Sequence, residues 1–266
     1  KITLFITITL LILSFFYPSA ASANSITYWQ ESDEGINGIS WSLFSHLVID
    51  PVTPSTLYLA AGLNGLYKST NGGGSWNRIG LGLPTQYIHD LVIDPRNHNV
   101  LYVAMDSWGT HKSTDGGSTW ERIFQAPYGW ESIYNLVVDP QTSTNLYACA
   151  REIGLIKSTD GGRTWTEKHD GIPVGWDIWD LAIDPDNPAI LYVFGLSKDY
   201  PPYSGIFRTS NAGEFWDDFS YGLPDKGYRG FELSPSDSNI LYTLVESWGG
   251  PEPVNEVYYT LYKSTD

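Results

Sequence analysis

The sequence predicts an all-β fold, a β-propeller of four-stranded antiparallel blades, with about five blades present in an incomplete ring. The first observation is a nine-residue phrase, Lys-Ser-Thr-Asp-Gly-Gly-x-Thr-Trp, which recurs in exact or looser form every 44 to 55 residues. The second is a phrase resembling Leu-Val-Ile-Asp-Pro that recurs in step with it. Strand-like repeats of this length are typical of propeller blades. Copies of the first phrase begin at Lys68, Lys112, Lys157, Arg208 and Lys263.

Each repeat contains signals for four strands. The apolar run of the second phrase lacks polar alternation, which suits an innermost strand buried on both faces, and the following Asp-Pro ends it. A recurrent Leu-Tyr pair marks the second strand, the residues up to the repeated Lys mark the third, and the Trp that ends the first phrase begins the fourth. We expect blades at about 45–80, 88–124, 133–169, 178–220 and 229–266.

The repeated turn phrase has a structural role. Its Asp or Asn accepts hydrogen bonds from amides of its own loop, and its glycines supply the positive φ of a tight hairpin. Its Trp is expected to pack between neighbouring sheets. We therefore assign structural roles to Asn71, Trp76, Asp115, Trp120, Asp160, Trp165, Asn211 and Trp216.

The N-terminus is of a different kind. Residues 1–23 combine a basic first residue, an uncharged apolar run and a small-x-small site, which predict a secretory signal peptide and a secreted propeller over 24–266. An uncleaved membrane anchor is the alternative. Trp29 and Gly35 are six residues apart, the same spacing that follows the Trp at three of the fourth strands. Residues 27–31 are therefore expected to form a lone fourth strand that completes the last blade and closes the ring. The alternative is that 24–40 form a disordered lead.

Composition excludes several classes of partner and chemistry. The formal net charge of −15 disfavours nucleic acid, and no membrane association is expected after signal cleavage. The five histidines show no ligand spacing, so no metal or other cofactor is expected. The lone cysteine, Cys149, lies in an apolar strand and is expected to be a buried, inert thiol.

The turn phrase resembles the Asp box, or bacterial neuraminidase repeat. This resemblance implies a relation to sialidases, xyloglucanase-like glycoside hydrolases, sortilin-type receptors and photosystem II assembly-factor propellers, whose activities differ. The arginine phrase of sialidases is missing its Pro here, which argues against that activity. The xyloglucanase-like enzymes place a catalytic Asp between the second and third strands, and the nearest match is Glu152 in Arg151-Glu-Ile-Gly154.

Ligand sites in propellers usually occupy the end of the ring where the second strand turns into the third. Two such loops share a phrase, at Asp106-Ser-Trp-Gly109 and at Glu246-Ser-Trp-Gly249. An indole can stack on a sugar ring while a carboxylate accepts hydrogen bonds from the hydroxyl groups of the sugar. A pair of carboxylates is also what glycoside hydrolysis requires. The candidate catalytic residues are Asp106, Glu246 and Glu152, and the candidate ligand-binding residues are Trp108, Trp248, Trp130, Trp176, Tyr200 and Tyr203.

The sequence therefore favours a secreted propeller that binds a polysaccharide or a protein partner. A glycoside hydrolase using a carboxylate pair on the loop face is the first alternative. A non-catalytic assembly or adhesion scaffold is the second.

Overall fold

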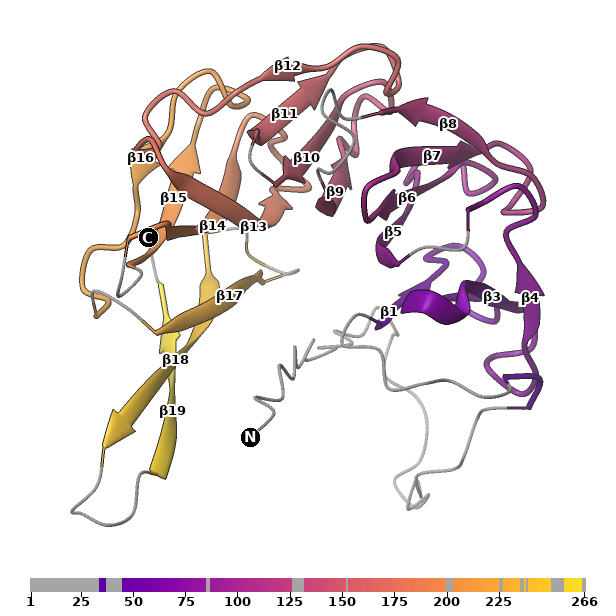
Figure 1. Ribbon diagram of the computed structural model, residues 1–266, viewed down its shortest axis with the longest axis horizontal. Coiled ribbons are helices and arrows are strands. Elements are labelled where there is room, and N and C mark those ends of the chain that lie inside the picture. The colour runs from indigo at the N-terminus through magenta and orange to yellow at the C-terminus, as the bar shows by residue number, and fades with distance from the viewer. Residues whose placement is uncertain are drawn as a thin grey trace.

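The computed structural model describes residues 34–36, 45–84, 87–125, 132–151, 153–199, 203–224, 227–234, 237, 239–249 and 256–264. Within them the chain forms five antiparallel sheets, arranged as the blades of a propeller about a common axis (Figure 1). Four sheets have four strands and the fifth has three among the described residues. The predicted all-β propeller of four-stranded blades is confirmed.

The strands of each blade follow the chain from the axis outwards. The first blade contains β1 (Ser45–Ile49), β2 (Leu57–Ala61), β3 (Leu66–Ser69) and β4 (Asn77–Ile79), with the short 3-10 helix η1 (Gly62–Asn64) between β2 and β3. The second contains β5 (Ile88–Ile93), β6 (Leu101–Met105), β7 (Gly109–Ser113) and β8 (Glu121–Phe124). The third contains β9 (Ile133–Val138), β10 (Leu146–Ala150), β11 (Gly154–Ser158) and β12 (Thr166–Glu167).

The last two blades follow the same order. The fourth contains β13 (Trp176–Ile183), β14 (Leu191–Ser197), β15 (Ser204–Thr209) and β16 (Asp217–Asp218). The fifth contains β17 (Tyr228–Leu233), β18 (Leu241–Gly249) and β19 (Glu256–Lys263). Strands β1, β5, β9, β13 and β17 lie nearest the axis, while β4, β8, β12 and β16 lie on the outer rim (Figure 1).

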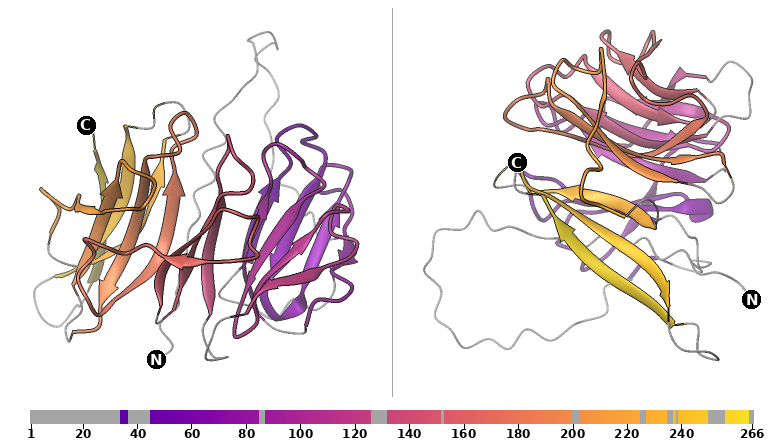
Figure 2. Two further views of the ribbon diagram at one scale, coloured as in Figure 1. Left: turned by 90° about the horizontal axis from the view of Figure 1, so that it is seen from above. Right: turned by 90° about the vertical axis from the view of Figure 1, so that its left-hand side faces the viewer.

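The hydrophobic core lies between neighbouring blades, which stand face to face (Figure 2). One cluster, for example, joins Tyr102 of β6 to Leu136 of β9 and Leu146 of β10, all at most 1% exposed. Cys149 is also buried in such a cluster, and burial raises the pKa of its thiol well above the usual range. Four of the five clusters in the described part of the chain combine side chains from two blades, so most of the core depends on the packing of neighbouring blades.

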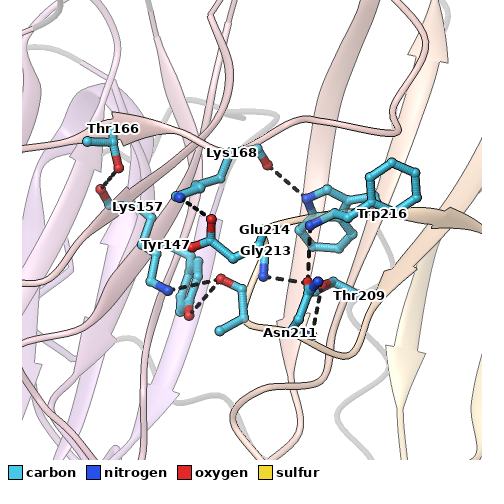
Figure 3. Close-up of polar contacts among 11 residues, drawn as sticks. Tyr147, Lys157, Thr166, Lys168, Thr209, Asn211, Gly213, Glu214 and Trp216 are labelled. Atoms are coloured by element: carbon cyan, nitrogen blue, oxygen red, sulfur yellow. Dashed lines mark hydrogen bonds and ion pairs between the residues drawn. The ribbon is translucent and has the colours of Figure 1, made fainter.

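The repeated hairpin joins each blade to the preceding one. In Figure 3, Lys157 Nζ and Tyr147 Oη of the third blade both donate to the Ala212 carbonyl in the hairpin of the fourth, at 3.0 and 3.4 Å. The Lys157 ammonium also lies 5.1 Å from the centroid of the Tyr147 ring. Inside the hairpin, Thr209 Oγ1 donates to Asn211 and accepts from the Gly213 amide. The repeated Lys and the recurrent Leu-Tyr pair therefore belong to one joint between blades.

The hairpins and the turns between second and third strands lie at opposite ends of the ring. The Asp106 amide, after β6, donates to the carbonyl of Tyr87 just before β5. The Gly116 amide, in the hairpin between β7 and β8, donates to the carbonyl of Asn99 just before β6. The turns between second and third strands therefore share one end with the segments that enter the inner strands. We call this end the loop end.

The residues before the first blade repeat a contact seen later in the ring. The Trp76 amide donates to the Glu34 carbonyl at 2.7 Å, as the Trp216 amide donates to the Asp170 carbonyl at 2.8 Å. The expected signal peptide (1–23) and closing strand (27–31) lie outside the described residues. No helix in the described part of the chain is long and apolar enough to span a bilayer.

Two equivalent glycines provide a matched test of this contact. Gly171 and Gly222 both have positive φ, +97° and +86°, and each lies six residues after a hairpin Trp. A Cβ at Gly171 would overlap the Trp216 carbonyl oxygen, whereas a Cβ at Gly222 would meet no atom of the described residues within 4 Å. We expect Gly222→Ala to cost about 1–2 kcal/mol for its backbone conformation, and Gly171→Ala to cost roughly 1–3 kcal/mol more. Urea unfolding of both variants checks this, and equal losses would contradict it.

Candidate functional site

Aromatic and charged side chains from three neighbouring blades converge at the loop end. They come from the inner strands β5, β9 and β13, from the residue just before β9, and from the turns that follow β6, β10 and β14. We call this set the loop-end strip. It contains His89, Asp106, Ser132, Tyr134, Arg151, Asp177, Trp179 and Lys198.

Backbone bulges place the aromatic members of the strip. In β5 the pairing with β6 passes from Ile88 to Asp90, so His89 is an extra residue without a partner in the register. Tyr134 in β9 and Trp179 in β13 are skipped in the same way. A bulge redirects the side chain of the extra residue, and bulges are common beside functional sites. Three successive blades thus present an aromatic ring from the same position.

These three rings form a continuous row across the blades. The His89 and Tyr134 rings meet edge to face, with centroids 5.2 Å apart. Tyr134 and Trp179 stack almost parallel, with centroids 4.5 Å apart and 9° between planes. Trp179 is 38% exposed, so part of its indole remains available to solvent. The row is therefore a rigid aromatic platform with an accessible end.

Asp106 lies at the His89 end of this row. Its carboxylate accepts a hydrogen bond from Ser132 Oγ of the next blade. The same carboxylate lies 3.8 Å from His89 Nε2. Burial lowers the pKa of His89, although Asp106 opposes this, so the imidazole is neutral at physiological pH. A carboxylate held beside a neutral imidazole can accept hydrogen bonds from the hydroxyl groups of a ligand.

Further charges border the Tyr134 and Trp179 end. Lys198 Nζ lies 3.3 Å from an oxygen of Asp177. Burial raises the pKa of the Tyr134 phenol, and the nearby Arg151 opposes that shift by charge and hydrogen bonding. The negative charges of Asp106 and Asp177 both raise the pKa of the same phenol. The platform is therefore flanked by carboxylates and by basic groups that can donate hydrogen bonds.

A second ring of polar residues, one position after each bulge, is structural. Asp90 is 2% exposed and accepts from the Leu136 amide of the next blade at 2.8 Å. His46 Nδ1 of the preceding blade lies 2.6 Å from the same carboxylate, which raises the pKa of His46. In the same way, Asp180 accepts from Asn135 Nδ2 of the preceding blade. These carboxylates are committed to holding the inner strands together.

The structure separates the two halves of the Asp106-Ser-Trp-Gly109 phrase. Asp106 contacts the third blade. The guanidinium of Arg122, on the rim strand β8, instead lies over the Trp108 ring, with its Cζ 5.8 Å from the ring centroid. Ser107 has a φ of 56°, which shows the sharp turn that divides them. Carboxylate and indole therefore do not face one ligand together.

The matching phrase of the fifth blade is not a loop, in contrast to the sequence-based expectation. Glu246 and Trp248 lie within β18, where they pair with Tyr259 and Val257 of β19. The two strands continue as a long hairpin away from the other sheets (Figure 1). Glu246 keeps one equivalence with Asp106, because its amide donates to the carbonyl of Gly227 just before β17. Both phrases have an acidic residue followed by Ser-Trp-Gly, but in the fifth blade the pairing of β18 with β19 continues through the phrase, so no turn forms there.

The other predicted site residues are dispersed. The Trp176 ring packs edge to face on Phe207, with centroids 5.3 Å apart, and belongs to the core. Tyr203 is 50% exposed in the turn before β15. The remaining three, Trp130, Glu152 and Tyr200, lie outside the described residues.

The hairpin residues assigned structural roles all lie in turns between third and fourth strands. Asp115 shows the contacts: its carboxylate accepts from Ser113 Oγ at 2.8 Å and from the amide and hydroxyl of Thr119 at 2.9 and 2.6 Å. These bonds lower the pKa of Asp115 to about 2. Trp120 Nε1 donates to the Gly117 carbonyl at 3.0 Å. These groups are used within the hairpin.

Sequence reasoning missed His89, Tyr134 and Trp179. A usable signal existed, since each lies two residues before the Leu that begins the second repeated phrase. The bulge that turns these side chains away from the sheet has no such signal, because it depends on pairing with the next strand. In the described part of the chain, no group of three His, Cys, Asp or Glu residues is arranged to hold a metal ion.

Comparisons with known proteins support the fold. No protein-family model matches the chain, and no curated protein sequence matches it. The GH74 enzyme of Niastella koreensis superposes with a TM-score of 0.67 at 22% identity, over 82% of this chain and 36% of that one. An ancestral GH74 enzyme gives 0.61 at 22% identity, over 89% and 32%. YCF48 from Cyanidioschyzon merolae gives 0.56 at 12% identity, over 81% and 70%.

These similarities cover only part of the GH74 enzymes. The chain spans about a third of the length of the two GH74 enzymes. At such identities the likeness shows the β-propeller fold and leaves the activity to be argued from the site.

Proposed function

We propose that this chain is a secreted Asp-box propeller whose loop-end strip binds a polysaccharide. The observation that carries this proposal is the row of His89, Tyr134 and Trp179, which is stacked across three blades and bordered by charged groups. The Asp-box assignment is supported by the hairpins, in which Asp115 and Asp160 accept hydrogen bonds from their own loops.

The chemistry of the strip suits a sugar chain. The C–H face of a pyranose ring packs on an exposed indole, and Trp179 offers one that Tyr134 holds in place by stacking. Sugar hydroxyls both donate and accept, and the strip supplies acceptors in Asp106 and Asp177 and donors in Arg151 and Lys198. Because the aromatic positions repeat from blade to blade, the strip extends in one direction, as an extended ligand requires. GH74 neighbours and the YCF48 neighbour are compatible with a polysaccharide or a protein partner, and the strip favours the polysaccharide.

Glycoside hydrolysis is the second candidate function, and one observation favours it. Asp106 and Asp177 are two carboxylates in one strip that act on the same Tyr134 phenol. Hydrolysis requires two carboxyl groups flanking the scissile bond, one of them a proton donor. In this scheme a sugar bound on the row would lie between them.

We predict that Trp179→Ala lowers the affinity for a bound polysaccharide at least tenfold, because it removes the accessible part of the platform. The probes are xyloglucan, mixed-linkage glucan and galactomannan, measured by isothermal titration and by affinity electrophoresis. Tyr221→Ala is the matched control, since Tyr221 is fully exposed and lies outside the strip. Equal affinity of wild type and Trp179→Ala, or no binding of any polysaccharide, would refute the proposal.

The same preparations distinguish binding from hydrolysis. Reducing-sugar release by the wild type that is lost in Asp106→Asn and in Asp177→Asn would establish the enzyme. Polysaccharide binding without release of reducing sugar would support a binding module and not an enzyme. Release that persists in both variants would exclude this carboxylate pair.

A further inference from the structure

A second set of side chains forms a shallow hollow on the opposite side of the second blade from the strip. It lies between the segment that follows the first blade and the outer strands β7 and β8 of the second. We call it the Trp108 hollow. It is lined by Gly82, Leu83, Pro84, Trp108, His111, Trp120 and Arg122.

The charge of this hollow differs from that of the chain. The formal net charge of the chain is −15, yet among the described residues the lining contains no carboxylate and one permanent cation, Arg122. Arg122 forms no ion pair with any of the described residues. Its guanidinium lies 5.8 Å from the centroid of the Trp108 ring, which restricts its orientation. A guanidinium held in this way is prepared for a bidentate contact with a carboxylate.

A buried imidazole adds unused hydrogen-bonding capacity. His111 is 4% exposed and lines the hollow, and its Nδ1 has no hydrogen-bond partner among the described residues. Burial, with the charge of Arg122, lowers the pKa of His111 to about 4, so the ring is neutral at physiological pH. An unpartnered buried polar atom is costly, and a neutral imidazole can exchange a hydrogen bond with a hydroxyl.

The remaining wall suits a sugar ring. Trp108 is 38% exposed, and Trp120 and Leu83 complete an apolar surface beside it. An indole favours the C–H face of a pyranose, and the single guanidinium favours one negative charge on that ring. A flexible acidic peptide would use the cation but would leave the indole face without a matching partner.

We propose that the Trp108 hollow binds a hexuronic acid residue of an acidic polysaccharide. The carboxylate contacts the Arg122 guanidinium, the ring packs on Trp108, and a hydroxyl group contacts His111. This site shares no residue with the loop-end strip, so it stands or falls independently of the proposed function.

Isothermal titration of the purified protein with short oligogalacturonides tests this site. We expect Arg122→Gln and Trp108→Ala each to weaken binding at least tenfold. Arg78→Gln is the matched control, because Arg78 lies on β4 at the equivalent rim strand of the first blade and outside the hollow. Trp179→Ala is expected to leave oligogalacturonide binding unchanged, which separates this site from the strip.

Chemical variants of the probe complete the test. Methyl-esterified oligogalacturonides lack the charge and are expected to bind the wild type as weakly as the acid form binds Arg122→Gln. Equal affinity for the ester, an unchanged affinity of Arg122→Gln, or no binding of the acid form would overturn the proposal. Equal binding of polyglutamate would overturn it in favour of an acidic peptide.

Discussion

Trp216→Ala is expected to destabilise the protein by about 3–5 kcal/mol, the range for truncating a fully buried aromatic side chain. Trp216 is 1% exposed and packs in the cluster that joins the third and fourth blades. Its Nε1 donates to the Lys168 carbonyl at 2.8 Å, so the variant also leaves that acceptor unpaired (Figure 3). Urea unfolding followed by circular dichroism measures the loss.

The neighbouring residue supplies the control for this variant. Phe215 is 52% exposed at the same hairpin, so Phe215→Ala is expected to change the free energy of unfolding by roughly 0.5 kcal/mol or less. A loss below about 1 kcal/mol in Trp216→Ala would show that the joint between these blades does not depend on the indole.

Asp90→Ala is expected to cost about 3–5 kcal/mol, because it breaks a buried charged network between three inner strands. The carboxylate accepts from the amides of Leu91 and Leu136 at 2.7 and 2.8 Å and lies 2.6 Å from His46 Nδ1. Removing it leaves two buried amides without an acceptor. Asp186→Ala, at an exposed turn residue, is the control, and a similar loss in both variants would contradict the assignment.

The cost of Asp90→Ala should also depend on pH. Asp90 raises the pKa of His46, with smaller contributions from Asp180 and Glu232. A raised pKa in the folded state contributes stability that is fully present below the unfolded value of about 6.5 and is lost as the pH rises through the folded value. The difference between wild type and Asp90→Ala is therefore expected to be larger at pH 6 than at pH 9. A difference independent of pH would indicate that the charge on His46 plays no part.

The strands were predictable because the repeat carries strong local signals. Pro51 and Pro95 end the inner strands of the first two blades, and the hairpin glycines Gly72 and Gly116 have the expected positive φ, 70° in each. Chain-local chemistry decides both features, since proline lacks an amide donor and glycine lacks a Cβ.

The candidate site was only partly predictable. Asp106 was selected from the sequence and lies in the loop-end strip, but its neighbour Trp108 lies on the other side of the blade. The repeated phrase at Glu246 suggested an equivalent turn, yet pairing with β19 extends the strand through it. A four-residue phrase does not determine whether two strands keep pairing, because that depends on the residues that face it across the hairpin.

The sequence alone determined the all-β class, the propeller architecture and the position of each hairpin, since periodic strands and turn residues act over a few neighbouring positions. Only the tertiary structure decided that His89, Tyr134 and Trp179 form one row and that Arg122 lies under Trp108. The residues of the row are about 45 positions apart, and Trp108 lies in the turn before β7 whereas Arg122 lies on β8. Their contacts arise from the stacking of whole blades and from bulges in the inner strands, which no local pattern specifies.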